Sequence, residues 1–128
     1  MLKLALVMIC GSLGTALRFG VVAIAQRLSP ATSEHAAWPW GTFVVNLAGC
    51  VAIGYLATMF AGRWPVREEV RLAVLVGILG GFTTFSSFAW EGLDMFQRGD
   101  PVKAIAYVVA SNVLGLGCAW LGATIART

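Results

Sequence analysis

A run of nine residues places two glycines, four hydroxyl side chains and three phenylalanines in the middle of a long apolar stretch. It spans residues 80–88 and reads GGFTTFSSF. The paired glycines loosen a helix, and the Ser and Thr side chains offer polar atoms. Irregular backbone at membrane depth is tolerated only where it is buried in protein or lines a cavity. The run therefore predicts a break in a membrane-spanning helix and a site for an ion or a small solute.

Two pairs of polar residues each share one face of a helix. Thr42 and Asn46 are four residues apart in the second apolar stretch, and Tyr107 and Ser111 have the same spacing in the last. The spacing predicts that the two pairs form a polar stripe between the second and the last apolar stretch. They either hold helices together or line a pathway, and their coexistence with the run at 80–88 favours the pathway.

Phe85 and Phe88 project from one helix face if the chain is helical after Thr84. Such a pair often serves packing alone. Because an aromatic ring has a positive edge, ring edges can also face an anion without binding it strongly. Weak sites suit conduction, since the ion must also leave. Ser86 and Ser87 add hydroxyl donors beside the rings.

Few charged residues interrupt the apolar stretches. Arg18 lies inside the first one, where it either extends toward a lipid headgroup or draws anions into an aqueous vestibule. Asp94 precedes Arg98 by four residues, and we expect an ion pair between them. The role of Glu91 stays open. The sequence contains no nucleophile–base set or metal-ligand cluster, so catalysis is not expected, and the single His35 is expected to be solvated in a loop.

The elements that position these residues are membrane-spanning helices. Of the 128 residues, 59% are hydrophobic and 12% are charged, whereas a soluble domain carries about 25% charged residues. Four apolar stretches are long enough to cross a hydrocarbon core of about 30 Å: approximately 4–26, 42–61, 72–97 and 102–126. We expect one all-α membrane domain over residues 1–128, with its third helix broken mid-membrane.

The charges outside these stretches fix the orientation poorly. Four spans would place five basic residues on one side and three on the other: Lys3, Arg63, Arg67, Arg71 and Arg127 against Arg27, Arg98 and Lys103. So weak a bias permits insertion both ways, and hence an antiparallel dimer. Fifteen glycines allow close helix approach, which favours a homo-oligomer. The start superficially resembles a signal peptide, but its length and Arg18 favour a retained span.

The chain resembles the Fluc or CrcB family of small dual-topology fluoride channels over essentially its whole length. The strongest match is the run at 80–88, close to the family signature GGLTTFSTF, and residues 14–18 and the GTFVVNLAG segment at 41–49 match as well. Phe82 replaces the commoner Leu, and Ser87 replaces Thr. Gly115 stands where some relatives carry Ser.

The resemblance implies a fluoride-selective channel that exports cytoplasmic fluoride passively and protects the cell from its toxicity. It implies an antiparallel (dual-topology) homodimer of four-helix subunits in the bacterial inner membrane, with two pores and a central structural Na⁺. The residues implied to line each pore come from three helices: Phe85, Phe88, Asn46, Ser111, Tyr107, Ser86, Ser87 and Thr42. Arg18 is implied to lie near the vestibule, and the backbone carbonyls of Gly80 and Thr83 to bind the Na⁺.

Two alternatives come from other classes of protein. A small four-helix proton-coupled exporter of cations or drugs needs a carboxylate at the centre of its substrate site. The first helix has none, and Glu91 lies late in the third. A purely structural membrane protein would show no ion flux and would tolerate Phe85→Ile and Asn46→Asp.

Overall fold

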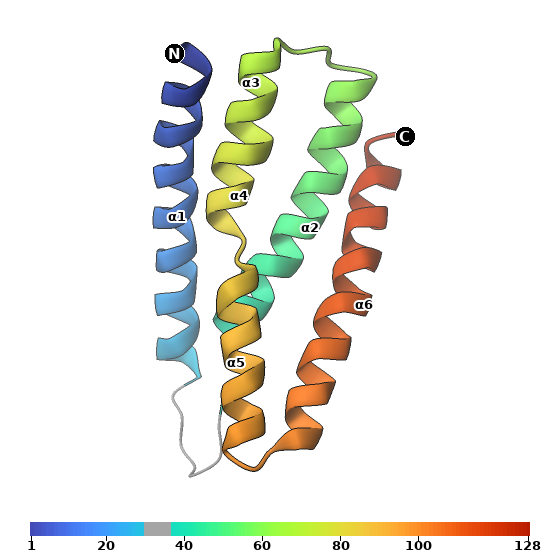
Figure 1. The fold of residues 1–128 in the computed structure, drawn as a ribbon. Coiled ribbons are helices and arrows are strands. Elements are labelled where there is room, and N and C mark those ends of the chain that lie inside the picture. Colours follow the sequence, from blue (N-terminus) through green and yellow to red (C-terminus); the bar gives the residue numbers. More distant parts are fainter. Residues whose placement is uncertain (30–36) are drawn as a thin grey trace.

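The computed structural model describes residues 1–29 and 37–128, and every regular element in them is a helix. Residues 30–36, and with them the predicted loop around His35, lie outside the described part. Four long rods stand side by side with both termini at the same end (Figure 1). The elements are α1 (Leu2–Leu28), α2 (Trp40–Ala61), α3 (Glu68–Leu72), the π-helix η1 (Ala73–Ile78), α4 (Leu79–Phe82), α5 (Phe85–Gln97) and α6 (Pro101–Ile125).

Each rod is long and apolar enough to cross a membrane. The four candidate spans are Leu2–Leu28, Trp40–Ala61, Glu68–Gln97 and Pro101–Ile125. They agree with the predicted stretches to within a few residues at each end. The third span is composite, since it consists of α3, η1, α4 and α5 in succession.

Glycines let the rods approach at the level of the backbone. A Cβ atom at Gly14 of α1 would overlap with the carbonyl oxygen of Ile78 in η1. A Cβ at Gly54 of α2 would overlap in the same way with the carbonyl oxygen of Ala119 in α6. Such contacts replace the hydrophobic effect as the source of helix association in lipid.

Two residues with extended backbone separate α4 from α5. Thr83 has φ −86° and ψ 160°, and Thr84 has φ −150° and ψ 117°. Helical geometry resumes at Phe85, where the Thr84 hydroxyl oxygen accepts a hydrogen bond of 3.2 Å from the backbone N–H of Ser87. Thr84 is therefore the N-cap of α5. The peptide groups at this interruption need partners outside their own helix.

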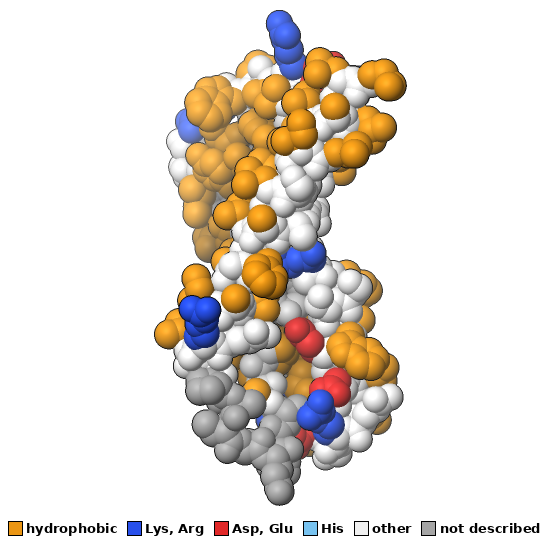
Figure 2. Space-filling model, turned by 90° about the vertical axis from the view of Figure 1, so that its left-hand side faces the viewer, with side chains coloured by type: hydrophobic (Ala, Val, Ile, Leu, Met, Phe, Trp, Pro, Cys, Tyr) orange, Lys and Arg blue, Asp and Glu red, His pale blue; other side chains and the backbone are white. Residues whose placement is uncertain are grey.

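The buried core lies beside α5, at the end of the molecule away from the termini. Phe88, Met95, Ala104 and Tyr107 form it, and Phe43 and Trp38 pack against it. The expected ion pair is also there: Arg98 Nε lies 2.8 Å from Asp94 Oδ2. Figure 2 shows acidic and basic side chains together in the lower half of the α1 face, whereas hydrophobic side chains dominate the upper half.

Candidate functional site

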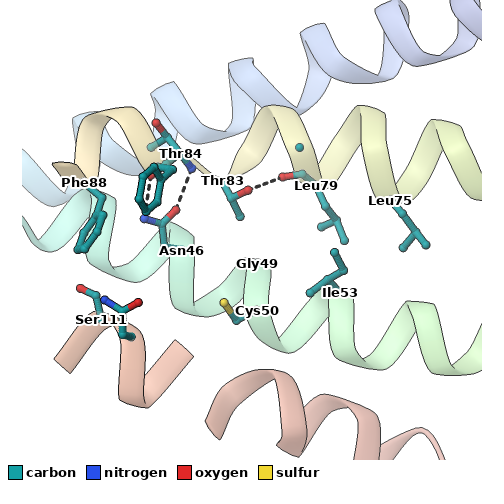
Figure 3. A pocket seen from close by; sticks show the side chains of 13 residues that line it. Asn46, Gly49, Cys50, Ile53, Leu75, Leu79, Thr83, Thr84, Phe88 and Ser111 are labelled. Atoms are coloured by element: carbon teal, nitrogen blue, oxygen red, sulfur yellow. Dashed lines mark hydrogen bonds between the residues drawn. The ribbon is translucent and has the colours of Figure 1, made fainter. Parts of the chain in front are cut away.

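The side chain of Asn46, on α2, reaches the interruption in the third span. Its Oδ1 accepts a hydrogen bond of 2.8 Å from the backbone N–H of Thr84, and its Nδ2 donates one of 3.1 Å to the Thr84 carbonyl (Figure 3). The amide has two N–H donors, so one remains for another partner. Asn46 thus supplies the hydrogen bonds that the interrupted helix lacks.

Arg18 reaches the same interruption from α1. Its Nη1 donates a hydrogen bond of 3.2 Å to the carbonyl oxygen of Thr83, and the contact is partly buried. A cation there also suits the negative end of α4, which terminates at Phe82. Arg18 is therefore directed toward the break in this chain. Its vestibule role stays a prediction.

A cavity of about 370 Å³ opens beside the break, between α2, the third span and α6. Six of the predicted site residues line it: Asn46, Gly80, Thr83, Phe85, Phe88 and Ser111. The remainder of its wall is mostly apolar, and Figure 3 shows Leu75, Leu79 and Ile53 at the end away from Phe88. The structure thus brings together side chains from three membrane spans. The first and the last of these side chains in the sequence, Asn46 and Ser111, are 65 positions apart.

The two phenylalanines differ in burial although they are neighbours. Their ring centroids are 5.6 Å apart at an interplanar angle of 46°. Phe85 is 78% exposed, whereas Phe88 is 9% exposed and contacts the ring of Tyr107 at 5.3 Å. Phe85 therefore stands at the open side of the cavity and Phe88 on its inner side.

Glu91 of α5 links the two polar stripes through one hydrogen bond to each. Thr42 Oγ1 donates to Glu91 Oε1 over 2.5 Å, and the Tyr107 hydroxyl donates to Glu91 Oε2 over 2.8 Å. The sequence left Glu91 without a role. Its position three residues after Phe88, and so on the same helix face, is the signal that could have found it.

The three predicted serines differ in their position relative to the first cavity. Ser111 lines the cavity, and its Oγ is buried without a partner among the described residues. Ser86 and Ser87 are exposed and do not line the cavity of the single chain. Ser87 Oγ accepts a hydrogen bond of 3.0 Å from Thr84 Oγ1. The two serines therefore continue the polar surface of the break rather than the cavity wall.

A second cavity of about 220 Å³ lies beside Glu91. Thr42, Glu91 and Trp38 contribute to its wall. The ring of Trp38 packs edge-on against that of Tyr107, with 5.4 Å between the ring centroids and 87° between the ring planes. Tyr107 is itself fully buried. Trp38 thus belongs to the surroundings of Glu91.

One family of known proteins matches most of this chain. Residues 5–123 match the family described as CrcB-like protein, Camphor Resistance (CrcB). The chain belongs to the CrcB family. This membership confirms the resemblance on which the pore residues were named, and with the four spans it makes the chain a multi-pass membrane protein rather than an enzyme.

Similar proteins from three bacteria carry one name, "Fluoride-specific ion channel FluC". The relative from Chloroflexus aurantiacus is 41% identical over 117 residues, which cover 91% of this chain and 88% of the relative. The relative from Paracoccus denitrificans is 42% identical with the same coverage. The relative from Rhizobium leguminosarum is 38% identical over 127 residues, 99% of this chain and 98% of the relative.

Proposed function

We propose that this CrcB family chain is a fluoride-selective channel of the bacterial inner membrane. The observation that carries the proposal is the convergence of Asn46, Phe85, Phe88 and Ser111 on one cavity, in a chain whose relatives are named fluoride-specific channels. The names of the relatives indicate that the ion is fluoride, and the cavity is where we propose that the ion binds.

Fluoride is small and strongly hydrated, so a pathway must replace its water with hydrogen-bond donors. The second N–H of the Asn46 amide and the unpartnered hydroxyl of Ser111 are two such donors on the cavity wall. The ring edges of Phe85 and Phe88 offer weaker positive potential. Hydrogen-bond donors combined with weakly attractive aromatic edges bind the anion only moderately, so that it can leave each site again.

Transport through such a pathway is passive. Hydrogen fluoride enters a cell as the neutral acid and dissociates inside to fluoride. A potential that is negative inside then drives the anion out with about 2.3 kcal/mol per charge for each 100 mV. Neither ATP nor a proton gradient is required, and the cell is protected from fluoride toxicity.

A second copy of the chain completes the pathway in this proposal. In a single chain Phe85 is 78% exposed and the cavity beside it is open. Ser86, Ser87 and Gly80 are exposed at the same break. We propose that an antiparallel copy covers this surface, which places the interruption of each third span mid-membrane and produces two pores per dimer.

The backbone at the break fits a structural Na⁺ at the centre of that dimer. A continuous helix would direct the Thr84 N–H to the Gly80 carbonyl, but this N–H donates to Asn46 instead. Gly80 is exposed, and a Cβ added to it would meet nothing within 4 Å. The Thr83 carbonyl accepts from Arg18 and has a second lone pair. Carbonyl oxygens suit a hard cation, and a bound Na⁺ would hold the two breaks together.

Fluoride efflux from liposomes that contain the purified dimer tests the proposal. Valinomycin clamps the potential, and chloride serves as the control anion. Fluoride release without chloride release supports a selective channel. Absence of fluoride release from dimeric protein would contradict it, and a flux that requires a proton gradient would favour the alternative, a small proton-coupled exporter of cations or drugs that uses Glu91.

A further inference from the structure

Two buried side-chain donors lack a hydrogen-bond partner among the described residues: Ser111 Oγ and Trp38 Nε1. Ser111 lines the first cavity and is explained by the proposed pathway. Trp38 is not. An indole N–H can only donate, and burial of a donor without an acceptor is unfavourable. This N–H therefore needs an acceptor that residues 1–29 and 37–128 do not provide.

The position of Trp38 connects it to the first cavity through two ring contacts. Phe88 lines that cavity, and its ring centroid lies 5.3 Å from that of Tyr107. The ring centroid of Tyr107 lies 5.4 Å from that of Trp38. Trp38 in turn lines the second cavity, of about 220 Å³. The rings of Phe88, Tyr107 and Trp38 are thus in continuous contact from the lining of one cavity to the lining of the other.

The electrostatics of the second cavity come from two opposed groups. Its wall includes Gly41 and Thr42, in the first turn of α2, and the N-cap of that helix, Pro39, makes no side-chain capping hydrogen bond. The positive end of α2 therefore lies at the cavity. Glu91 brings the opposite charge, but its two oxygens already accept from Thr42 and Tyr107. An anion beside Trp38 would be attracted by the helix end and repelled by Glu91, so it would bind weakly.

We infer that the indole N–H of Trp38 donates a hydrogen bond to fluoride in the second cavity, and that the pathway continues past Tyr107 to this cavity. The inference rests on the proposed channel function and adds a residue that neither the polar stripes nor the phenylalanine pair includes. In this view Trp38 is the donor at the end of the pathway where α2 begins.

Removal of the N–H alone tests the inference. Trp38→Phe keeps an aromatic ring against Tyr107 but has no donor. Because hydrogen bonds to an ion are about twice as strong as neutral ones, we expect fluoride efflux from liposomes to fall roughly tenfold. Trp120→Phe is the matched control, since Trp120 is 70% exposed on α6. Its efflux should equal that of the original protein.

A second measurement does not depend on ion conduction by any variant. In the ¹⁵N-labelled full-length protein in micelles, Trp38→Phe and Trp120→Phe assign the two indole N–H resonances. Sodium fluoride should move the Trp38 resonance and leave that of Trp120 in place, and sodium chloride should move neither. A bridging water in place of fluoride predicts no response of Trp38 to either salt.

The outcomes separate the two proposals. If the original protein conducts fluoride but the Trp38 resonance is unmoved by fluoride, or Trp38→Phe conducts normally, the inference is overturned and the channel stands. If the original protein conducts no fluoride, the channel proposal is overturned and the inference with it. A Trp38→Phe protein that fails to fold leaves the decision to the response of the original protein, with the Trp38 resonance then assigned by elimination using Phe variants of the other tryptophans.

Discussion

The side-chain amide of Asn46 forms two hydrogen bonds with the backbone of a single residue, Thr84. It accepts from the N–H over 2.8 Å and donates to the carbonyl over 3.1 Å. This pairing satisfies two peptide polar groups at the position where the third span leaves helical geometry. The break is therefore maintained by the second span.

Asn46→Ala should destabilise the fold, because it leaves both polar groups of Thr84 without their partner. Each unsatisfied buried group costs about 1–3 kcal/mol, so we expect a loss of roughly 2 kcal/mol or more in the free energy of unfolding. Unfolding of the detergent-solubilised protein measures it. Asn112→Ala is the control, since Asn112 is exposed and donates only to Val108 of its own helix. Equal stability of the two variants would contradict the bracing role of Asn46.

Phe85→Ile should abolish fluoride efflux while the protein remains folded. Phe85 is 78% exposed in the single chain, so its replacement removes little packing, but isoleucine has no positive ring edge. Efflux from liposomes and circular dichroism together check this. Phe96→Ile, at 57% exposure on the same helix, should conduct normally. Normal conduction by Phe85→Ile would remove this residue from the pathway.

Gly14→Ala should loosen the contact between α1 and η1. The added Cβ would overlap with the carbonyl oxygen of Ile78, which belongs to backbone and cannot rotate away. Overpacking of this kind costs about 1–3 kcal/mol, measurable as a lower thermal midpoint in detergent. A Cβ at Gly20 of the same helix would meet nothing within 4 Å, so Gly20→Ala should leave the midpoint nearly unchanged.

Gly80→Ala separates the stability of one chain from that of the dimer. Within a chain the added methyl group has open space, so helix content and the fold should be kept. If a second copy and Na⁺ approach at the break, the methyl group should weaken the dimer and its dependence on Na⁺. Cross-linking in proteoliposomes with Na⁺ or K⁺ measures both effects. Gly117→Ala, which is equally unobstructed, is the control, and identical dimerisation of the two variants would argue against an interface at Gly80.

Glu91→Gln distinguishes a channel from a proton-coupled exporter. The amide keeps a carbonyl acceptor, and the Thr42 or Tyr107 hydroxyl can rotate to accept from its NH₂ group. We therefore expect the variant to fold and to release fluoride in response to the clamped potential, at an altered rate. Efflux measured with and without an imposed pH gradient checks this. A pH gradient that drives transport in the original protein, but not in the variant, would favour the exporter.

The sequence by itself determined the class of the protein, its four spans and the family to which it belongs. Hydrocarbon admits few alternatives to a continuous helix, so length and hydropathy suffice to find spans, and the run at 80–88 is conspicuous because it departs from that requirement. Asn46 and Ser111 of the first cavity could be singled out because polar groups inside apolar stretches are rare. The roles of Phe85, Phe88, Gly80 and Thr83 came from the family resemblance, and the apolar part of the wall was not predicted.

Only the tertiary structure decided which of these groups meet. Helical spacing shows that Thr42 and Tyr107 each lie on a polar face. Which groups they meet depends on how the helices pack, and the structure places Glu91 of α5 between them. The partnership of Asn46 with Thr84 and the buried position of Trp38 likewise depend on contacts between segments distant in the chain. Such contacts cannot be predicted from local sequence, because their energy comes from the packing of one helix against another.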